Sequence, residues 1–216
     1  MAKIISIIQV KGGAGRSTIA TNLAGLMSTS KKVALIDCDM PQATAASWAS
    51  IRQGNLTVAT AADHLEVVKQ VEKLNDSHDF IVIDAPPRIA EVTKVALMLS
   101  ELCLVPLGAS AAEIWATSDL LKTIDAAKAI KADIDVRIIW NRFRASTKSA
   151  QELSEAAHSE LKLKELKNRL GYRVAYSEAM ARGMTVTEWT DKTAKSEMLS
   201  LGKELEKILK VKFIKD

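Results

Sequence analysis

Val10-Lys11-Gly12-Gly13-Ala14-Gly15-Arg16-Ser17-Thr18 lies between an apolar run at 4–10 and a segment with helical spacing at 17–28. A glycine-rich turn that joins a strand to a helix is the context of a phosphate-binding loop. Glycines let successive backbone N–H groups turn toward an anion, and the helix start adds unpaired donors and a partial positive charge. The stretch therefore predicts a nucleotide-phosphate site rather than a flexible glycine turn. The Ser17 hydroxyl is expected to bind Mg²⁺, and Thr18 to reach a phosphate oxygen.

Outward from this loop, strand-like and helix-like runs alternate along the chain. Because the strand-like runs are apolar throughout, they are expected to be buried on both faces of a sheet. Their alternation with helices predicts an α/β fold with a doubly wound, mostly parallel sheet and right-handed crossovers. No Pro/Gly/Ser-rich linker interrupts the pattern, so residues 1–216 are predicted to form a single domain. The expected strands are 4–10, 33–36, 80–83, 102–107 and 136–140, with candidates at 56–59 and 173–176; the expected helices are 17–28, 43–51, 64–74, 92–99, 112–130, 147–170 and 196–210.

Carboxylates follow two of these apolar runs. Asp37 and Asp39 come after 33–36, and Asp84 follows 80–83. In a doubly wound sheet the carboxyl ends of the strands face the ligand, so these side chains are expected beside the phosphate loop. Asp84 has the position of a carboxylate that holds Mg²⁺ through water. The alternative is that these are ordinary strand ends with solvated aspartates.

Taken together, these segments resemble the deviant Walker A ATPases of the ParA/MinD type, and most closely the small plasmid-type ParA partition proteins. The loop 10–18 resembles the deviant Walker A box of that family. Asp37-Cys38-Asp39-Met40-Pro41-Gln42 resembles its Asp-x-Asp-Pro-Gln segment with Met40 inserted, and Asp84-Ala85-Pro86-Pro87 resembles its Asp-x-Pro-Pro switch. The resemblance implies a P-loop NTPase fold, ATP and Mg²⁺ as cofactors, and a homodimer that forms on ATP binding.

The resemblance also implies a role for each matching residue. Lys11 would reach across the dimer to the partner's phosphates, and Asp39 would orient the attacking water. Asp37 and Asp84 would join Ser17 at the metal. Asn141, in the segment Ile138-Ile139-Trp140-Asn141-Arg142, would contact the adenine base. The expected catalytic residues are thus Lys11, Asp39 and Arg16, and the expected nucleotide ligands are Gly12, Gly13, Ala14, Gly15, Arg16, Ser17, Thr18 and Asn141.

Arg16 departs from the family pattern, which usually has lysine at this position. Guanidinium is planar, bulkier than an ammonium group and prone to bidentate contacts. Nucleotide binding is expected to survive this change, but hydrolysis need not. The sequence therefore leaves two alternatives open: a slow ATPase, or an ATP-gated binding module with little hydrolysis.

The charge is unevenly distributed along the chain. The formal net charge is +4, but residues 1–121 carry 10 Lys/Arg and 12 Asp/Glu, a balance of −2, whereas residues 122–216 carry 20 and 14, a balance of +6. A basic half of this kind indicates a polyanionic partner or a lysine-rich solvated surface. The resemblance favours non-specific DNA, phosphate-directed and salt-sensitive. The candidate contacts are Arg142, Arg144, Lys148, Lys162, Lys164, Lys167, Arg169, Arg173, Lys203, Lys207 and Lys210.

The remaining expectations concern partners and compartment. The resemblance implies a ParB-like centromere-binding or cargo adaptor, although a protein organelle such as a carboxysome remains an alternative cargo. Cys38 and Cys103 lie in strand-like runs, as reduced core thiols of a cytoplasmic protein do. No signal peptide and no apolar stretch near the ~20 residues of a bilayer span are found. A nucleoid-associated protein with no membrane partner is thus expected; the alternative is a MinD-like positioner that binds lipid through 211–216.

Overall fold

The computed structural model describes residues 1–40, 42–87, 90–144 and 148–214, with the side chains of 148–151 omitted. Seven strands form one sheet in the order β3-β2-β4-β1-β5-β6-β7, and every pairing is parallel. The strands are β1 (Lys3–Ile7), β2 (Val33–Asp37), β3 (Thr57–Thr60), β4 (Phe80–Asp84), β5 (Leu102–Leu107), β6 (Asp135–Trp140) and β7 (Lys164–Glu165). The helices are α1 (Arg16–Ser28), α2 (Thr44–Ile51), α3 (His64–Asn75), α4 (Ala90–Leu99), α5 (Ala111–Lys128), α6 (Lys148–Leu161), α7 (Ala175–Met180) and α8 (Lys192–Leu209).

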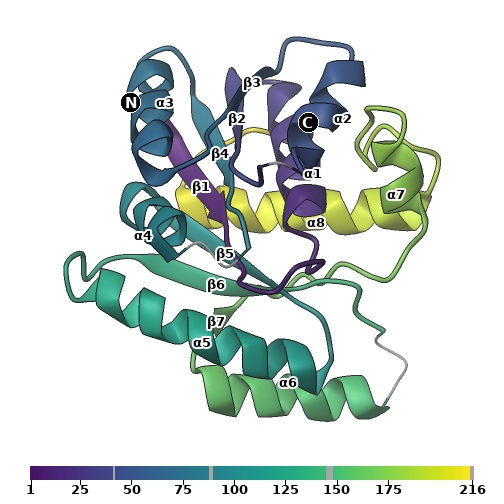
Figure 1. Cartoon of the computed structure of the whole chain (residues 1–216). Coiled ribbons are helices and arrows are strands. Elements are labelled where there is room, and N and C mark those ends of the chain that lie inside the picture. The colour runs from purple at the N-terminus through teal and green to yellow at the C-terminus, as the bar shows by residue number, and fades with distance from the viewer. Residues whose placement is uncertain (41, 88–89, 145–147, 215–216) are drawn as a thin grey trace.

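Helices cover both faces of the sheet, as the apolar strands predict (Figure 1). All residues of β2, β4 and β5 are buried. One apolar core lies between the sheet and α3, α4, α5 and α6, and the other between the sheet and α1, α2, α7 and α8. The predicted doubly wound α/β fold is confirmed.

The register of the central strands brings the predicted site residues together. Asp37, the last residue of β2, pairs with Asp84, the last residue of β4. Asp84 in turn pairs with Ile7, the last residue of β1, from which the glycine loop leads into α1. Parallel pairing therefore fixes both carboxylates level with the loop, at the carboxyl edge of the sheet.

The predicted helix 147–170 is wrong beyond Leu161. There the chain turns around the edge of the sheet: Leu163 packs in one core and Leu166 in the other, with β7 between them. A helix that continued through this segment could not place Leu163 in the core on one face of the sheet and Leu166 in the core on the other. The Leu166 amide instead donates to the Ile138 carbonyl at the sheet edge.

The predicted strand 173–176 is also wrong, because Ala175 begins α7. Its surroundings are set by α8, where Glu197 accepts hydrogen bonds from the Gly171 amide and from the Arg173 guanidinium. Helix α8 itself begins at Lys192, four residues before the predicted start, because the Asp191 carboxylate caps it by accepting from the amides of Thr193 and Ala194.

The C-terminal segment after α8 folds back onto the molecule. The Glu206 carboxylate accepts from the amides of Phe213 and Ile214 at 2.7 and 2.8 Å, and the Ser30 hydroxyl donates to the Phe213 carbonyl at 2.6 Å. The Phe213 ring is 1% exposed and packs edge-on against Phe80. Phe213, an apolar residue of the segment 211–216 through which the alternative MinD-like positioner would bind lipid, is therefore buried; Lys215 and Asp216 lie outside the described residues. Within the described part of the chain, no helix is long and apolar enough to cross a membrane.

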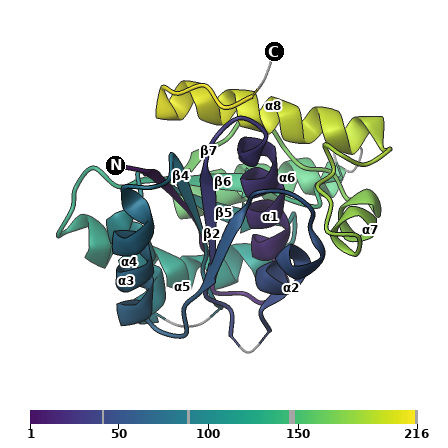
Figure 2. The same ribbon diagram turned by 90° about the horizontal axis from the view of Figure 1, so that it is seen from above.

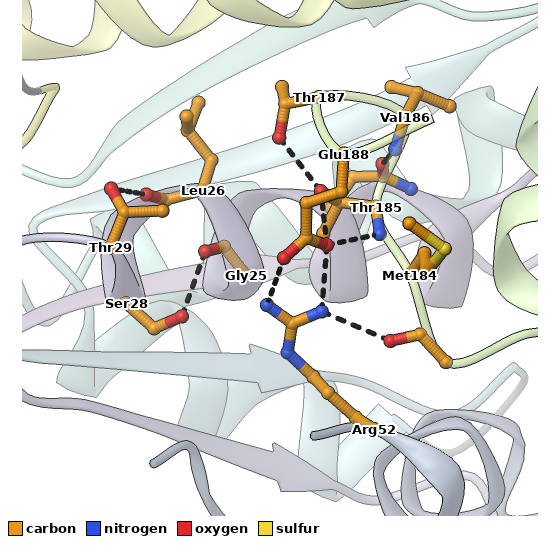
Figure 3. A network of polar contacts seen from close by, with 12 residues as sticks. Gly25, Leu26, Ser28, Thr29, Arg52, Met184, Thr185, Val186, Thr187 and Glu188 are labelled. Atoms are coloured by element: carbon orange, nitrogen blue, oxygen red, sulfur yellow. Dashed lines mark hydrogen bonds and ion pairs between the residues drawn. The ribbon is translucent and has the colours of Figure 1, made fainter. Parts of the chain in front are cut away.

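A polar network ties the loop 183–188 to α1 and α2 (Figure 3). Arg52, just after α2, forms a bidentate ion pair with Glu188 at 2.9 and 3.0 Å and donates to the Gly183 carbonyl. Glu188 also accepts from the Thr185 amide and hydroxyl. The Val186 amide donates to Asn22 of α1. These contacts fix α1, which follows the glycine loop, against α2, which follows the Asp37–Asp39 turn.

Candidate nucleotide site

The glycine loop reaches α1 through two residues in the left-handed region, Gly13 at φ 76° and Gly15 at φ 94°. A Cβ atom on Gly15 would overlap the Asn141 side-chain amide, so this position requires glycine on two counts. Gly15 is the N-cap of α1 and provides no side-chain cap, and no acidic residue stands in the first turn. The first amides of α1 are therefore left for an external acceptor, as in helix starts that bind phosphate.

Arg16 folds back onto the loop from which it emerges. Its side chain is 5% exposed, and Nη1 donates to the carbonyls of Gln9 at 2.7 Å and Lys11 at 2.8 Å. Nη2 lies 3.4 Å from Asp39 Oδ2. Nε has no hydrogen-bond partner among the described residues. The guanidinium thus braces the loop backbone and partly neutralises Asp39, a double contact that the compact lysine ammonium could not make in the same way.

The two strand-end carboxylates differ in their hydrogen bonding. Both oxygens of Asp37 accept backbone amides, one from Asp39 and one from Ala46 at the start of α2. Both oxygens of Asp84 are buried without a hydrogen-bond partner in the described structure. Asp37 therefore holds the turn and α2 in place, whereas Asp84 is the carboxylate that is open to a cation.

The electrostatics of Asp84 support this distinction. Burial, together with the charge of Asp37, raises the pKa of Asp84 from 3.8 to about 7, although Ser17 and Arg16 act in the opposite direction. A buried carboxyl group of this kind is stabilised when a cation binds. Mg²⁺ commonly takes one or two carboxylates, with waters and substrate phosphates completing its shell. Ser17 and Asp84 fit that donor set; the described residues contain no group of three or more His, Cys, Asp or Glu that could hold a metal alone.

Lys11 lies on the rim of the loop, beside α5. Its side chain is 37% exposed, and Nζ is 3.9 Å from Glu113 Oε1. Glu113 is held by the amide of Gly108, and its own amide donates to the Ser110 hydroxyl, which caps α5. Lys11 is thus near solvent, where it could reach a second molecule, and its contact with Glu113 is long enough to be weak.

Asn141 is buried between the loop and a small pocket. Its Nδ2 donates to the Ala14 carbonyl at 2.9 Å, and its Oδ1 accepts from the Arg142 amide. Asn141 therefore braces the loop, and contact with a base is an additional role that stays a prediction. The pocket has a volume of about 290 Å³ and is lined by Thr18, Asn141, Arg142, Gly171, Tyr172, Arg173, Val174, Tyr176, Ser177 and Met180.

The sequence-predicted residues thus fall into one region. Asp37, predicted as a metal ligand, accepts two backbone amides, and Asn141, predicted to contact adenine, donates to the Ala14 carbonyl, so both ligand roles stay predictions. Lys11, the loop 12–18, Asp37, Asp39, Asp84 and Asn141 all lie at or beside the carboxyl edge of β1, β2, β4 and β6. Pro41 lies outside the described residues. Sequence reasoning missed Glu113, although Ser110-Ala111-Ala112-Glu113 has the spacing of a helix-capping motif. It also missed Gln9, whose amide nitrogen joins the loop to the Pro106 carbonyl and the Thr117 hydroxyl.

The raised pKa of Asp84 predicts how the stability of the nucleotide-free protein depends on pH. Between 3.8 and about 7 the folded state holds a proton on Asp84 that the unfolded state has released, so the contribution of Asp84 to stability falls as pH rises through this window and levels off above it. Asp84→Asn removes this titration. Melting temperatures without nucleotide or Mg²⁺ should therefore favour the variant increasingly from pH 4 to 7. Parallel melting curves across that range would contradict the assignment.

Comparison with known proteins matches most of the chain to one family of nucleotide-binding domains. The family model for the CobQ/CobB/MinD/ParA nucleotide-binding domain matches residues 5–186. The carboxysome distribution protein A of Halothiobacillus neapolitanus is 25% identical over 84% of this chain and 85% of its own length. The chromosome partitioning protein ParA of Myxococcus xanthus is 27% identical over 96% of this chain and 89% of its own. An ATP complex of McdA from Cyanothece shares the fold, with a TM-score of 0.82 and 16% identity over 100% of this chain and 99% of that one. With its glycine loop, uncapped α1 and buried Asp84 inside the matched region, the chain belongs to the CobQ/CobB/MinD/ParA family of nucleotide-binding domains.

Proposed function

We propose that this protein is a DNA-partition ATPase that binds ATP with Mg²⁺, dimerises and binds DNA without sequence preference. Hydrolysis stimulated by a ParB-like adaptor would then release the dimer. The observation that carries the nucleotide chemistry is the unpartnered Asp84 carboxylate beside the uncapped start of α1. The name of the Myxococcus relative, a chromosome partitioning protein, supports DNA as the cargo.

Each residue of the nucleotide site has its own role in the proposed ATPase cycle. The amides of 13–18 bind phosphate, and Ser17 and Asp84 hold Mg²⁺, which would supply positive charge at the β- and γ-phosphates. Asp39 orients the attacking water once Arg16 no longer neutralises it. Lys11 leaves Glu113 and places its ammonium group against the phosphates of the second subunit.

A second candidate cargo is a protein organelle. The Halothiobacillus relative is named for carboxysome distribution and covers most of this chain. The ATP-driven cycle would be the same in both cases, and only the adaptor would differ. Pull-down with proteins encoded by neighbouring genes distinguishes the two: a centromere-binding adaptor supports DNA partition, and a shell-associated adaptor supports the organelle.

Lys11→Ala is expected to abolish ATP-dependent dimerisation and to lower adaptor-stimulated hydrolysis on the order of 10²-fold or more, since a cation supplied in trans has effects of that size or larger. Sedimentation with ATP and a phosphate-release assay measure the two effects. Lys122→Ala is the matched control, because this exposed α5 lysine pairs only with Asp119 among the described residues. Equal dimerisation by wild type and Lys11→Ala would rule out the action in trans.

Arg16→Lys tests the alternative of a binding module with little hydrolysis. Lysine cannot brace both carbonyls and Asp39 as the guanidinium does, so Asp39 would be released and a compact charge left for the phosphates. We expect phosphate release to rise by about tenfold, equivalent to about 1.4 kcal/mol of barrier, with little change in ATP affinity. No turnover above background in wild type or variant, with DNA and adaptor present, would leave only the binding module.

Two of the candidate DNA contacts interact with other groups of the protein. Arg173 is paired with Glu197, and Arg169 lies over the Phe143 ring and donates to Ser154. Six lysines among the candidates are exposed and show no ion pair among the described residues: Lys162, Lys164 and Lys167 gather around β7, and Lys203, Lys207 and Lys210 lie on α8. The Lys148 side chain lies outside the described structure. We assign phosphate binding to the three β7 lysines.

Lys164→Glu combined with Lys167→Glu is expected to weaken retention of duplex DNA by the ATP-bound protein. The dependence of affinity on salt should also flatten, by about one unit of slope for each phosphate that the protein no longer neutralises. Retention at rising salt measures both effects. Lys69→Glu on α3, which packs against β2 and β4 toward the other end of the sheet, is the control. If wild type with ATP shows no affinity at low salt, the basic half is only a solvated surface.

A further inference from the structure

The C-terminal half of α8 carries a basic groove with an apolar floor, far from the nucleotide. The groove has a volume of about 730 Å³. Lys203, Lys207, Lys210 and Lys212 stand along it, all exposed, over a floor of half-buried Leu199, Val211 and Ile214. Figure 2 shows α8 as the outer helix above α1.

The lysines of the groove outnumber its acids, because Glu206 is the one acidic residue among the described residues that line it and its carboxylate accepts backbone amides of the C-terminal segment. Glu204 accepts from the amides of Lys167 and Asn168. Glu206 accepts from the amides of Phe213 and Ile214. Burial raises the pKa of Glu206, but these amides, Lys212 and Lys203 outweigh it, so its pKa lies below the ordinary value and it remains an ionised cap. None of the four lysines forms an ion pair within the described structure.

One of the lysines also occupies a backbone position that favours glycine. Lys210 ends α8 at φ 54°, in the left-handed region. Glycine commonly ends helices in this conformation because it has no Cβ to clash. The lysine adds charge to the groove at a position where glycine would be less strained.

We infer that this groove binds an acidic amphipathic segment of a partner protein, with carboxylates on the lysines and apolar side chains on the floor formed by Leu199, Val211 and Ile214. Charge complementarity requires an anionic ligand, and the spacing of Lys203, Lys207 and Lys210 matches acids three and four residues apart on a helix. Phosphate alone would gain nothing from the apolar floor, whereas leucine or isoleucine side chains would be removed from water there. A bilayer surface fits less well, because Phe213 is buried and α8 is itself part of the core packing.

The groove lies at the opposite end of α1 from the glycine loop. Ser30, just beyond the end of α1, binds the same C-terminal segment that forms one wall of the groove. Helix α1 has 13 residues, or about 20 Å at 1.5 Å per residue. A partner seated here would leave the proposed face-to-face contact across the nucleotide free.

The test uses the full chain and a labelled amphipathic peptide with glutamates three and four residues apart beside a leucine face. Fluorescence anisotropy should show saturable binding that Lys203→Glu with Lys207→Glu weakens by at least about tenfold. Lys192→Glu with Lys195→Glu, on the same helix but outside the groove, should leave it unchanged. Equal weakening by both pairs would overturn the inference, because the attraction would then be a general effect of charge.

Two further variants separate the groove from a phosphate-binding surface and from loss of fold. Leu199→Asn should weaken the peptide but not duplex DNA, while the β7 lysine variant should do the reverse. Lys210→Gly should weaken the peptide without lowering the melting temperature, since it removes charge and backbone strain together. Groove-dependent binding of anionic vesicles or of DNA, with no binding of the peptide, would overturn the proposal.

Discussion

The buried Asp84 carboxyl group is the constraint on which the nucleotide site depends. Parallel pairing places it at the end of β4, between β1 and β2, where water cannot reach it. A buried carboxyl group without a hydrogen bond is costly, and the protein lowers that cost by protonating it, as the raised pKa of Asp84 indicates. A cation that binds there would displace the proton. Metal affinity and folding stability are therefore linked through one side chain.

Arg16 is a second buried charged group, and the glycine loop supplies its hydrogen-bond acceptors. A buried guanidinium needs acceptors, and the carbonyls of Gln9 and Lys11 supply two, with Asp39 nearby. These contacts hold the loop in shape without a ligand, but they also occupy Asp39. Lysine at this position would leave the loop carbonyls without those contacts and the carboxylate free. Arg16 therefore orders the free loop, and in the proposed ATPase cycle Asp39 would have to be released from it before hydrolysis.

Strands with both faces buried were predictable because their composition depends on burial alone. β2, β4, β5 and the glycine loop follow from local runs, and register then brings Asp37 and Asp84 together. The segment 162–176 was mispredicted because its path depends on crossing the sheet edge and on anchoring by Glu197 and Glu204, which lie far along the chain. The Asp191 cap of α8 is a local signal that the prediction missed, because the helix was expected to begin only at residue 196. Which oxygens of Asp37 are already satisfied is a three-dimensional fact that no local pattern contains.

The hydrogen bonds of the C-terminal half explain why its surface is more cationic than its composition indicates. A balance of +6 over 95 residues would be modest if the acids lay among the lysines. On α8, however, Asp191, Glu204 and Glu206 act as acceptors for backbone amides. These carboxylates face backbone amides of the protein, whereas the lysine side chains of α8 are exposed to solvent. Helix caps and chain anchors thereby separate charge in space, so the outer surface is more cationic than the composition suggests. The same bonds that fix the tail and the β7 loop thus create the surface on which an anionic partner can bind.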